Sequence, residues 1–126
     1  MTLSRRQARR QALFLLYQWD LSGQEIGSQY AGEIDPWALG VAEAVSHRAE
    51  TLDARITAAS EGWTADRLGA VERSALRVAV HELFEREVPP QVAINEAVAF
   101  AKRYASDDAA KLVNGILGRI QREEAA

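Results

Sequence analysis

The sequence predicts an all-helical protein of six or seven helices. Three observations support this prediction. Apolar residues recur at helical spacing over most of the chain, no stretch alternates with period two, and glycines and prolines separate the periodic stretches. Because 126 residues are enough for one core, we expect residues 1–126 to form a single domain.

Helix start and stop signals place each element in turn. The first helix is predicted from Ser4 to Leu21, since Ser4 and Gln7 resemble a capping box and Gly23 stands at the position of a C-terminal cap. The glycine-rich stretch 23–33 predicts a loop. Caps and breakers then predict a long helix from Pro36 to near Gly62, a short turn from Thr64 to Leu68, helices over Val71–Glu87 and Gln91–Ala105, and a final helix starting at Ser106-Asp107-Asp108. In that final helix, the residues expected to pack inward are Leu112, Val113, Ile116, Leu117 and Ile120.

Charge is distributed unevenly along the chain. The net charge is −3, but residues 1–19 hold four arginines and no acid, so the remainder carries −7. A local basic patch on an acidic body binds polyanions only at that patch. The distribution therefore predicts that anions bind at the N-terminal end of the chain. It argues against non-specific binding of nucleic acid over the whole surface.

The four arginines are Arg5, Arg6, Arg9 and Arg10, and they fall within an arc of about 140° on the first helix. Cations in a first turn oppose the helix dipole, and like charges at i,i+4 repel. With no acid nearby in sequence, these arginines predict an external anion, phosphate first, rather than a merely solvated helix end. Arginine also favours bidentate phosphate contacts and stacking on bases. The other helices are expected to pack around the apolar second half of this helix, which would make it the central helix of the fold.

Catalytic chemistry is not indicated. The chain has no cysteine, and His47 and His81 make a poor catalytic set. His81 and Glu85 stand at i,i+4, but no third metal ligand is evident, and no nucleotide or cofactor motif occurs. We therefore expect no catalytic residue, no metal and no cofactor.

Several other residues are expected to be structural or solvated. His81 is predicted to be a partly exposed helical histidine, and the nearby glutamates Glu82, Glu85 and Glu87 are predicted to be solvated. The three tryptophans, Trp19, Trp37 and Trp63, are expected to pack between helices. Asn114-Gly115 is unusual inside a helix, and close packing over the glycine is the expected reason.

No apolar stretch has the length of about 20 residues that a membrane span needs, and the N-terminus lacks the features of a secretory signal. These observations predict a cytoplasmic protein.

Five segments, in their order and spacing, resemble the NusB family of bacterial transcription antitermination factors. They are RRQARRQALFLLYQWDL at the start, the spaced Trp63 and Arg67, VERSALRVAVHEL (71–83), VPPQVAINEAVAFAK (88–102) and KLVNGILGRI (111–120). The resemblance covers nearly the whole chain. It implies two packed helical subdomains and binding of the boxA element of ribosomal RNA leader transcripts. The implied partner is NusE, a small-subunit ribosomal protein, and the implied outcome is read-through by RNA polymerase.

The resemblance also implies roles for individual residues. The residues matching RNA-contacting segments are Arg5, Arg6 and Arg9, with Arg10 beside them, and Lys111 and Leu112, with Asp108 just before them. The residues matching the NusE-facing surface are Tyr17 and Glu72, with Arg73 and Arg77 as further candidates. Relatives often carry phenylalanine where this chain has Leu112.

Two other functions are compatible with the residues alone. One is a helical protein-interaction or homodimerisation module with little RNA affinity of its own. The other is an enzyme, because NusB-like domains also occur fused to ribosomal RNA cytosine methyltransferases, but no cofactor loop is present here. Preference for boxA RNA over a scrambled sequence counts against the interaction module.

Overall fold

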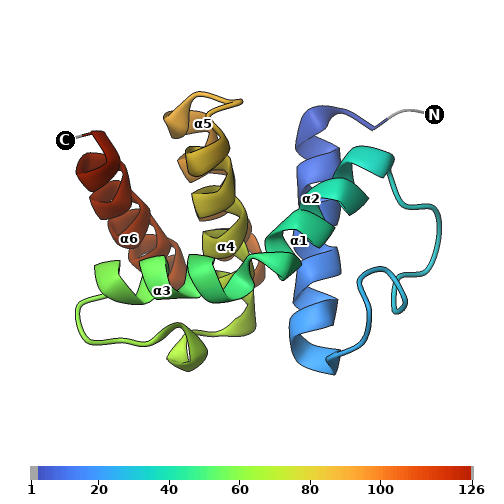
Figure 1. The fold of residues 1–126 in the computed structure, drawn as a ribbon, viewed down its shortest axis with the longest axis horizontal. Coiled ribbons are helices and arrows are strands. Elements are labelled where there is room, and N and C mark those ends of the chain that lie inside the picture. Colours follow the sequence, from blue (N-terminus) through green and yellow to red (C-terminus); the bar gives the residue numbers. More distant parts are fainter. Residues whose placement is uncertain (1–2, 126) are drawn as a thin grey trace.

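The computed structural model describes residues 3–125, and helices are the regular elements of this part of the chain, which contains no strand. Six α-helices and one turn of 3₁₀-helix follow one another in sequence (Figure 1). Their bounds are α1 Arg5–Ser22, α2 Pro36–His47, α3 Ala49–Ala59, η1 Ala65–Arg67, α4 Ala70–Glu85, α5 Pro90–Tyr104 and α6 Asp107–Ala125. The all-helical prediction is confirmed.

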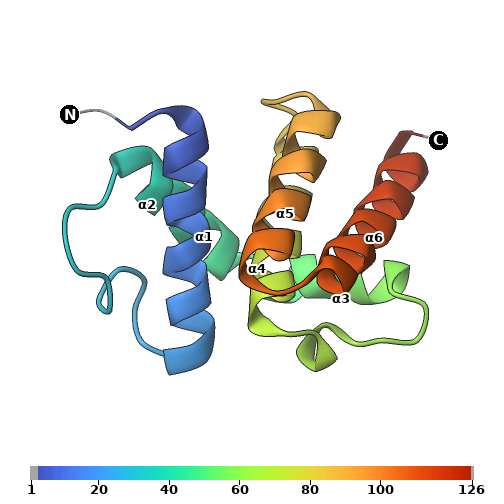
Figure 2. The same ribbon diagram turned by 180° about the vertical axis from the view of Figure 1, so that it is seen from behind.

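The helices form two packed groups. In Figures 1 and 2, α1 and α2 lie together on one side, and α3 to α6 form the other group. One contiguous apolar cluster includes residues from all six α-helices, so the two groups share a core. No described helix combines the length and apolar character needed to cross a membrane.

The central helix is α4. It contacts each of the other five α-helices, and every residue from Ser74 to Glu82 is buried. Burial over successive residues rather than along one stripe shows that α4 is packed on more than one side. The expectation that α1 is the central helix was wrong, because α1 packs mainly on α2 and α4 at one side of the molecule.

The ends of α1 follow the local sequence. The Ser4 hydroxyl accepts a hydrogen bond from the Gln7 backbone N–H at 3.1 Å, and the Gln7 side chain accepts one from the Ser4 N–H at 2.9 Å. This is a complete capping box. At the other end, Gly23 adopts φ 71°, a left-handed conformation that glycine reaches without strain.

The predicted long second helix was wrong, because it is two helices separated at Arg48. Arg48 has φ −104° and ψ 8°, which turns the chain between α2 and α3. The break has a packing reason: α2 lies against α1, whereas α3 lies against α4 and α6. The side chain of Arg48 reaches α4, where Nη1 donates to Glu85 at 3.0 Å.

Three residues lie in surroundings that differ from expectation. Leu112, expected inside, is 37% exposed on α6. Gly115 is exposed, with no atom near the position of a Cβ, so close packing does not explain the Asn114-Gly115 pair. Trp63, expected between helices, is 52% exposed. On α6 the inward positions are filled by Val113, Ile116, Leu117 and Ile120, which leaves Leu112 at the surface.

Candidate nucleic-acid interface

The N-terminal half of α1 places three of its four arginines at the surface. The Arg5 guanidinium lies 4.2 Å from the ring centre of Trp37 on α2, a cation–π contact. Arg6 is 71% exposed at its side chain and donates to Glu96 of α5 at 2.9 Å. Arg10 is exposed, and no carboxylate of the described chain lies within ion-pair distance of it. These three cations remain open to a ligand.

Arg9 is different, and here the sequence prediction needs correction. Its side chain is 5% exposed and makes a bidentate pair with Glu82 of α4, with Nε–Oε1 2.7 Å and Nη2–Oε2 2.8 Å. Glu82, expected to be solvated, is equally buried. At least one of the four arginines is therefore paired with an acid inside the protein. Arg9 fastens the basic end of α1 to the central helix and does not present its guanidinium to solvent.

A basic groove lies between α1 and α5, with a volume of about 370 Å³. Its walls also bring together cationic and aromatic side chains from the two helices. The lining residues are Arg6, Arg9, Arg10 and Leu13 of α1 and Glu96, Ala99, Phe100, Lys102, Arg103 and Tyr104 of α5. With Arg9 paired inside the protein, the rim carries four other cations against one carboxylate, so the groove has the charge that a polyanion requires.

The second predicted RNA segment lies at the start of α6. Asp108, Lys111 and Leu112 are all exposed and occupy i, i+3 and i+4 positions, so they share one face of α6. Figure 2 shows α5 between α1 and α6. The two basic segments are therefore separated by α5, and a strand that contacts both has to pass over that helix.

Comparison with known proteins agrees with this arrangement of helices. The family model described as the NusB family matches residues 6–122. The chain belongs to the NusB family. A transcription antitermination protein NusB from Rubrobacter xylanophilus is 43% identical over 122 residues, covering 91% of this chain and 88% of the relative.

Solved NusB structures share the fold closely. The structure of T. maritima NusB matches with a TM-score of 0.84 and 32% identity, covering 98% of this chain and 94% of that chain. A crystal structure of the antitermination factors NusB and NusE in complex with double-stranded RNA matches with a TM-score of 0.81 and 32% identity, covering 94% and 96%. The two packed helical groups are thus the NusB fold.

Two of the residues predicted to face NusE are partly exposed. Tyr17 lies in the C-terminal half of α1, and Glu72 lies in the first turn of α4. Both side chains are therefore accessible to a partner. An acid in the first turn of a helix is also favoured by the helix dipole.

The two weaker candidates, Arg73 and Arg77, are held inside the protein. Arg73 donates to Asp20 through Nε at 3.1 Å, and Arg77 donates to Asp20 at 3.2 Å and to Asp53 at 2.7 Å. Although burial alone lowers the pKa of Arg77, the carboxylates of Asp53 and Asp20 leave it raised above its ordinary value. Arg77 joins α4 to α1 and α3, whereas Arg73 joins α4 to α1 and donates to the Ala65 and Leu68 carbonyls, so neither has a free guanidinium for a partner.

His81 is buried, not partly exposed as predicted. Its Nδ1 lies 3.0 Å from Nη1 of Arg48, the residue at the α2–α3 break. The described residues contain no group of three metal-ligating side chains, so His81 and Glu85 have no third ligand there. His81 thus links α4 to the bend between α2 and α3.

The histidine predicts a pH-dependent stability. Burial and the positive charge of Arg48 hold the pKa of His81 below its ordinary value of 6.5, against the opposing effect of the carboxylates of Glu85, Glu82 and Glu87. Because the unfolded chain binds this proton first as the pH falls, the free energy of unfolding decreases below about pH 6.5, until the folded protein is protonated too. Its slope stays below about 1.4 kcal/mol per pH unit. Urea unfolding at pH 5.5 and 7.5 measures this, and H81Q is expected to show a smaller difference.

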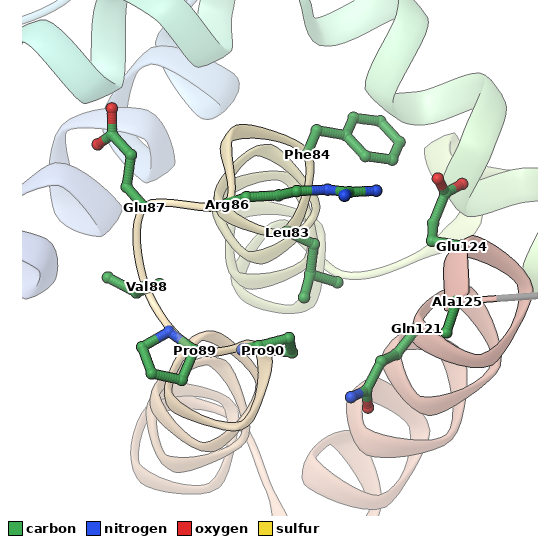
Figure 3. A pocket seen from close by; sticks show the side chains of 10 residues that line it. All are labelled: Leu83, Phe84, Arg86, Glu87, Val88, Pro89, Pro90, Gln121, Glu124 and Ala125. Atoms are coloured by element: carbon green, nitrogen blue, oxygen red, sulfur yellow. The ribbon is translucent and has the colours of Figure 1, made fainter.

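Another pocket lies at a different place, where the C-terminal ends of α4 and α6 meet the α4–α5 connection (Figure 3). Its volume is about 900 Å³. The residues lining it are Leu83, Phe84, Arg86, Glu87, Val88, Pro89, Pro90, Gln121, Glu124 and Ala125. With one arginine against two glutamates, this pocket lacks the cationic excess of the α1–α5 groove and is the poorer site for a polyanion.

Proposed function

We propose that this protein is a transcription antitermination factor that binds the boxA RNA of ribosomal RNA leader transcripts as a single strand. In this proposal it acts together with NusE, as part of the RNA polymerase antitermination complex, and promotes read-through. The single observation that carries the proposal is the cationic rim of the α1–α5 groove on an otherwise acidic chain. The structure of NusB and NusE with RNA, which shares the fold, supports the same class of partners.

The proposal assigns different tasks to the arginines. Arg5, Arg6 and Arg10 bind phosphates, and Lys111 on α6 binds another, with Asp108 and Leu112 beside it. Arg9 does not bind RNA but holds α1 on α4 through its ion pair with Glu82. The burial of both side chains supports this assignment. Rigid placement of the three exposed arginines lowers the entropy lost when RNA binds.

NusE is assigned to the surface around Tyr17 and Glu72. Phosphate contacts position an RNA strand, whereas bases specify sequence, so a few arginines alone give modest and weakly selective binding. A protein partner that adds contacts raises both affinity and selectivity. In this proposal residues 1–126 act as one RNA-binding unit in the cytoplasm, by binding and without catalysis.

The test is a titration of labelled boxA RNA at several salt concentrations, using wild type and the double variant R6A/R10A. Loss of two charged contacts is expected to weaken binding about tenfold or more. It is also expected to make the log–log salt slope shallower by about 1.4, since each phosphate contact on a single strand contributes about 0.7. Unchanged affinity and slope would rule out this end of α1 as the site.

Two controls separate specific binding from general charge. R67A removes an exposed arginine of η1, outside the groove, and is expected to bind boxA RNA like wild type. A scrambled RNA of the same composition is expected to bind more weakly than boxA in the presence of NusE. Equal binding of both RNAs with NusE present contradicts sequence recognition.

A further inference from the structure

The C-terminal turn of α5 is not used by the proposed phosphate contacts, although it lies between them. Lys102, Arg103 and Tyr104 are all exposed, and all three line the α1–α5 groove. In Figure 2 α5 lies between α1 and α6, so an RNA strand that contacts both helices, as in the proposed function, passes α5.

Tyr104 is an exposed aromatic ring with a fixed position. It is 38% exposed, yet its ring packs edge-on against Phe14 of α1, with centroids 5.0 Å apart at 77°. On its own helix it packs against Phe100 at 4.9 Å. An aromatic ring that its neighbours already hold in place loses little conformational freedom when a further ring packs on it.

The neighbouring cations suit a nucleotide at the same place. Arg103 donates through Nε to the Tyr104 hydroxyl at 3.1 Å, with its guanidinium 5.5 Å from the ring centre. Lys102 lines the same groove, whose volume falls within the range of about 300–1,000 Å³ typical of small-ligand sites. By contrast, the exposed apolar residue of the adjoining α6 face is the aliphatic Leu112, which offers no ring for stacking.

We propose that Tyr104 is the stacking platform for an unpaired base of the bound RNA, and that Lys102 and Arg103 bind the adjoining phosphates. Single-stranded RNA is recognised by splaying bases onto aromatic rings while cations follow the backbone. This inference rests on the proposed RNA-binding function. It adds α5 to the RNA site, because α5 supplies Tyr104, the ring that contacts the base.

Affinity and salt dependence test the two parts separately. Y104L is expected to weaken boxA RNA binding roughly 5- to 150-fold, the range for loss of one stacked base, and to leave the salt slope unchanged. Y104F keeps the ring and is expected to bind like wild type. The double variant K102A/R103A is expected to make the salt slope shallower by about 1.4. W63L removes an exposed aromatic ring that does not line the groove and is the matched control.

Wild-type protein provides a measurement that does not depend on the folding of a variant. BoxA RNA carrying 5-bromouridine is irradiated in the complex, and the cross-linked peptide is mapped. A cross-link at Tyr104 supports the proposal. No cross-link there, or wild-type affinity of a folded Y104L, overturns it. If R6A/R10A still weakens binding in that case, only this inference fails, whereas wild-type binding by both variants overturns the proposed function as well.

Discussion

Replacing Glu82 with alanine is expected to lower the free energy of unfolding by about 3–5 kcal/mol. The reason is that Arg9 then remains as a buried charge without its partner. Arg9 and Glu82 are almost completely buried and joined by two short hydrogen bonds, so water does not replace the lost carboxylate. Urea unfolding of E82A at pH 7 measures the change.

A double variant distinguishes a structural pair from an RNA contact. Replacing both members with apolar residues of similar volume, as in R9M/E82L, removes the unpaired charge and is expected to restore most of the stability. If Arg9 only positions α1, the double variant binds boxA RNA within about threefold of wild type. A loss of tenfold or more in a stable R9M/E82L protein would show that Arg9 contacts the RNA itself.

The second large effect is expected at Asp20. This carboxylate accepts hydrogen bonds from both Arg73 and Arg77, and its side chain is only 11% exposed. D20A leaves two nearby guanidinium groups without the acid between them. Because Arg77 keeps its pair with Asp53, we expect a loss of about 2–3 kcal/mol rather than the full cost of an isolated buried charge.

Glu123 is the matched control for Asp20. It also pairs with two arginines, Arg55 at 2.8 Å and Arg119 at 2.9 Å, but its side chain is 46% exposed. Its carboxyl pKa is lowered chiefly by the hydrogen bond from Arg119. Solvent screens such pairs, so E123A is expected to lower the free energy of unfolding much less than D20A does. Equal losses for D20A and E123A would mean that burial of the network at Asp20 adds nothing.

Local sequence was sufficient for most helix ends. The Ser4–Gln7 capping box and Gly23 delimit α1 as predicted, because those interactions join residues at most four positions apart. Asp35 caps α2 in the same way, with its carboxylate accepting from the N–H groups of Trp37 and Ala38. Elements defined by short-range hydrogen bonds and apolar periodicity are readable from the chain alone.

The α2–α3 break could not be predicted in this way. The apolar stripe continues through it, from Val45 to Leu52 and Ile56, so no local signal ends the helix at Arg48. What decides the bend is that one half packs on α1 and the other on α4 and α6. Packing against different partners overrides intrinsic helix propensity.

For the site, the sequence determined that four arginines share the first turns of α1 and that the rest of the chain is acidic. It could not determine which of them are free. Arg9 meets Glu82 across 73 residues, and Arg77 meets Asp20 across 57, so both pairings exist only once α4 packs on α1. The same packing places Tyr104 of α5 against Phe14 of α1 and so forms the groove. Charge content is a property of the chain, whereas the exposure of each charge depends on which side chains the folded helices bring within reach.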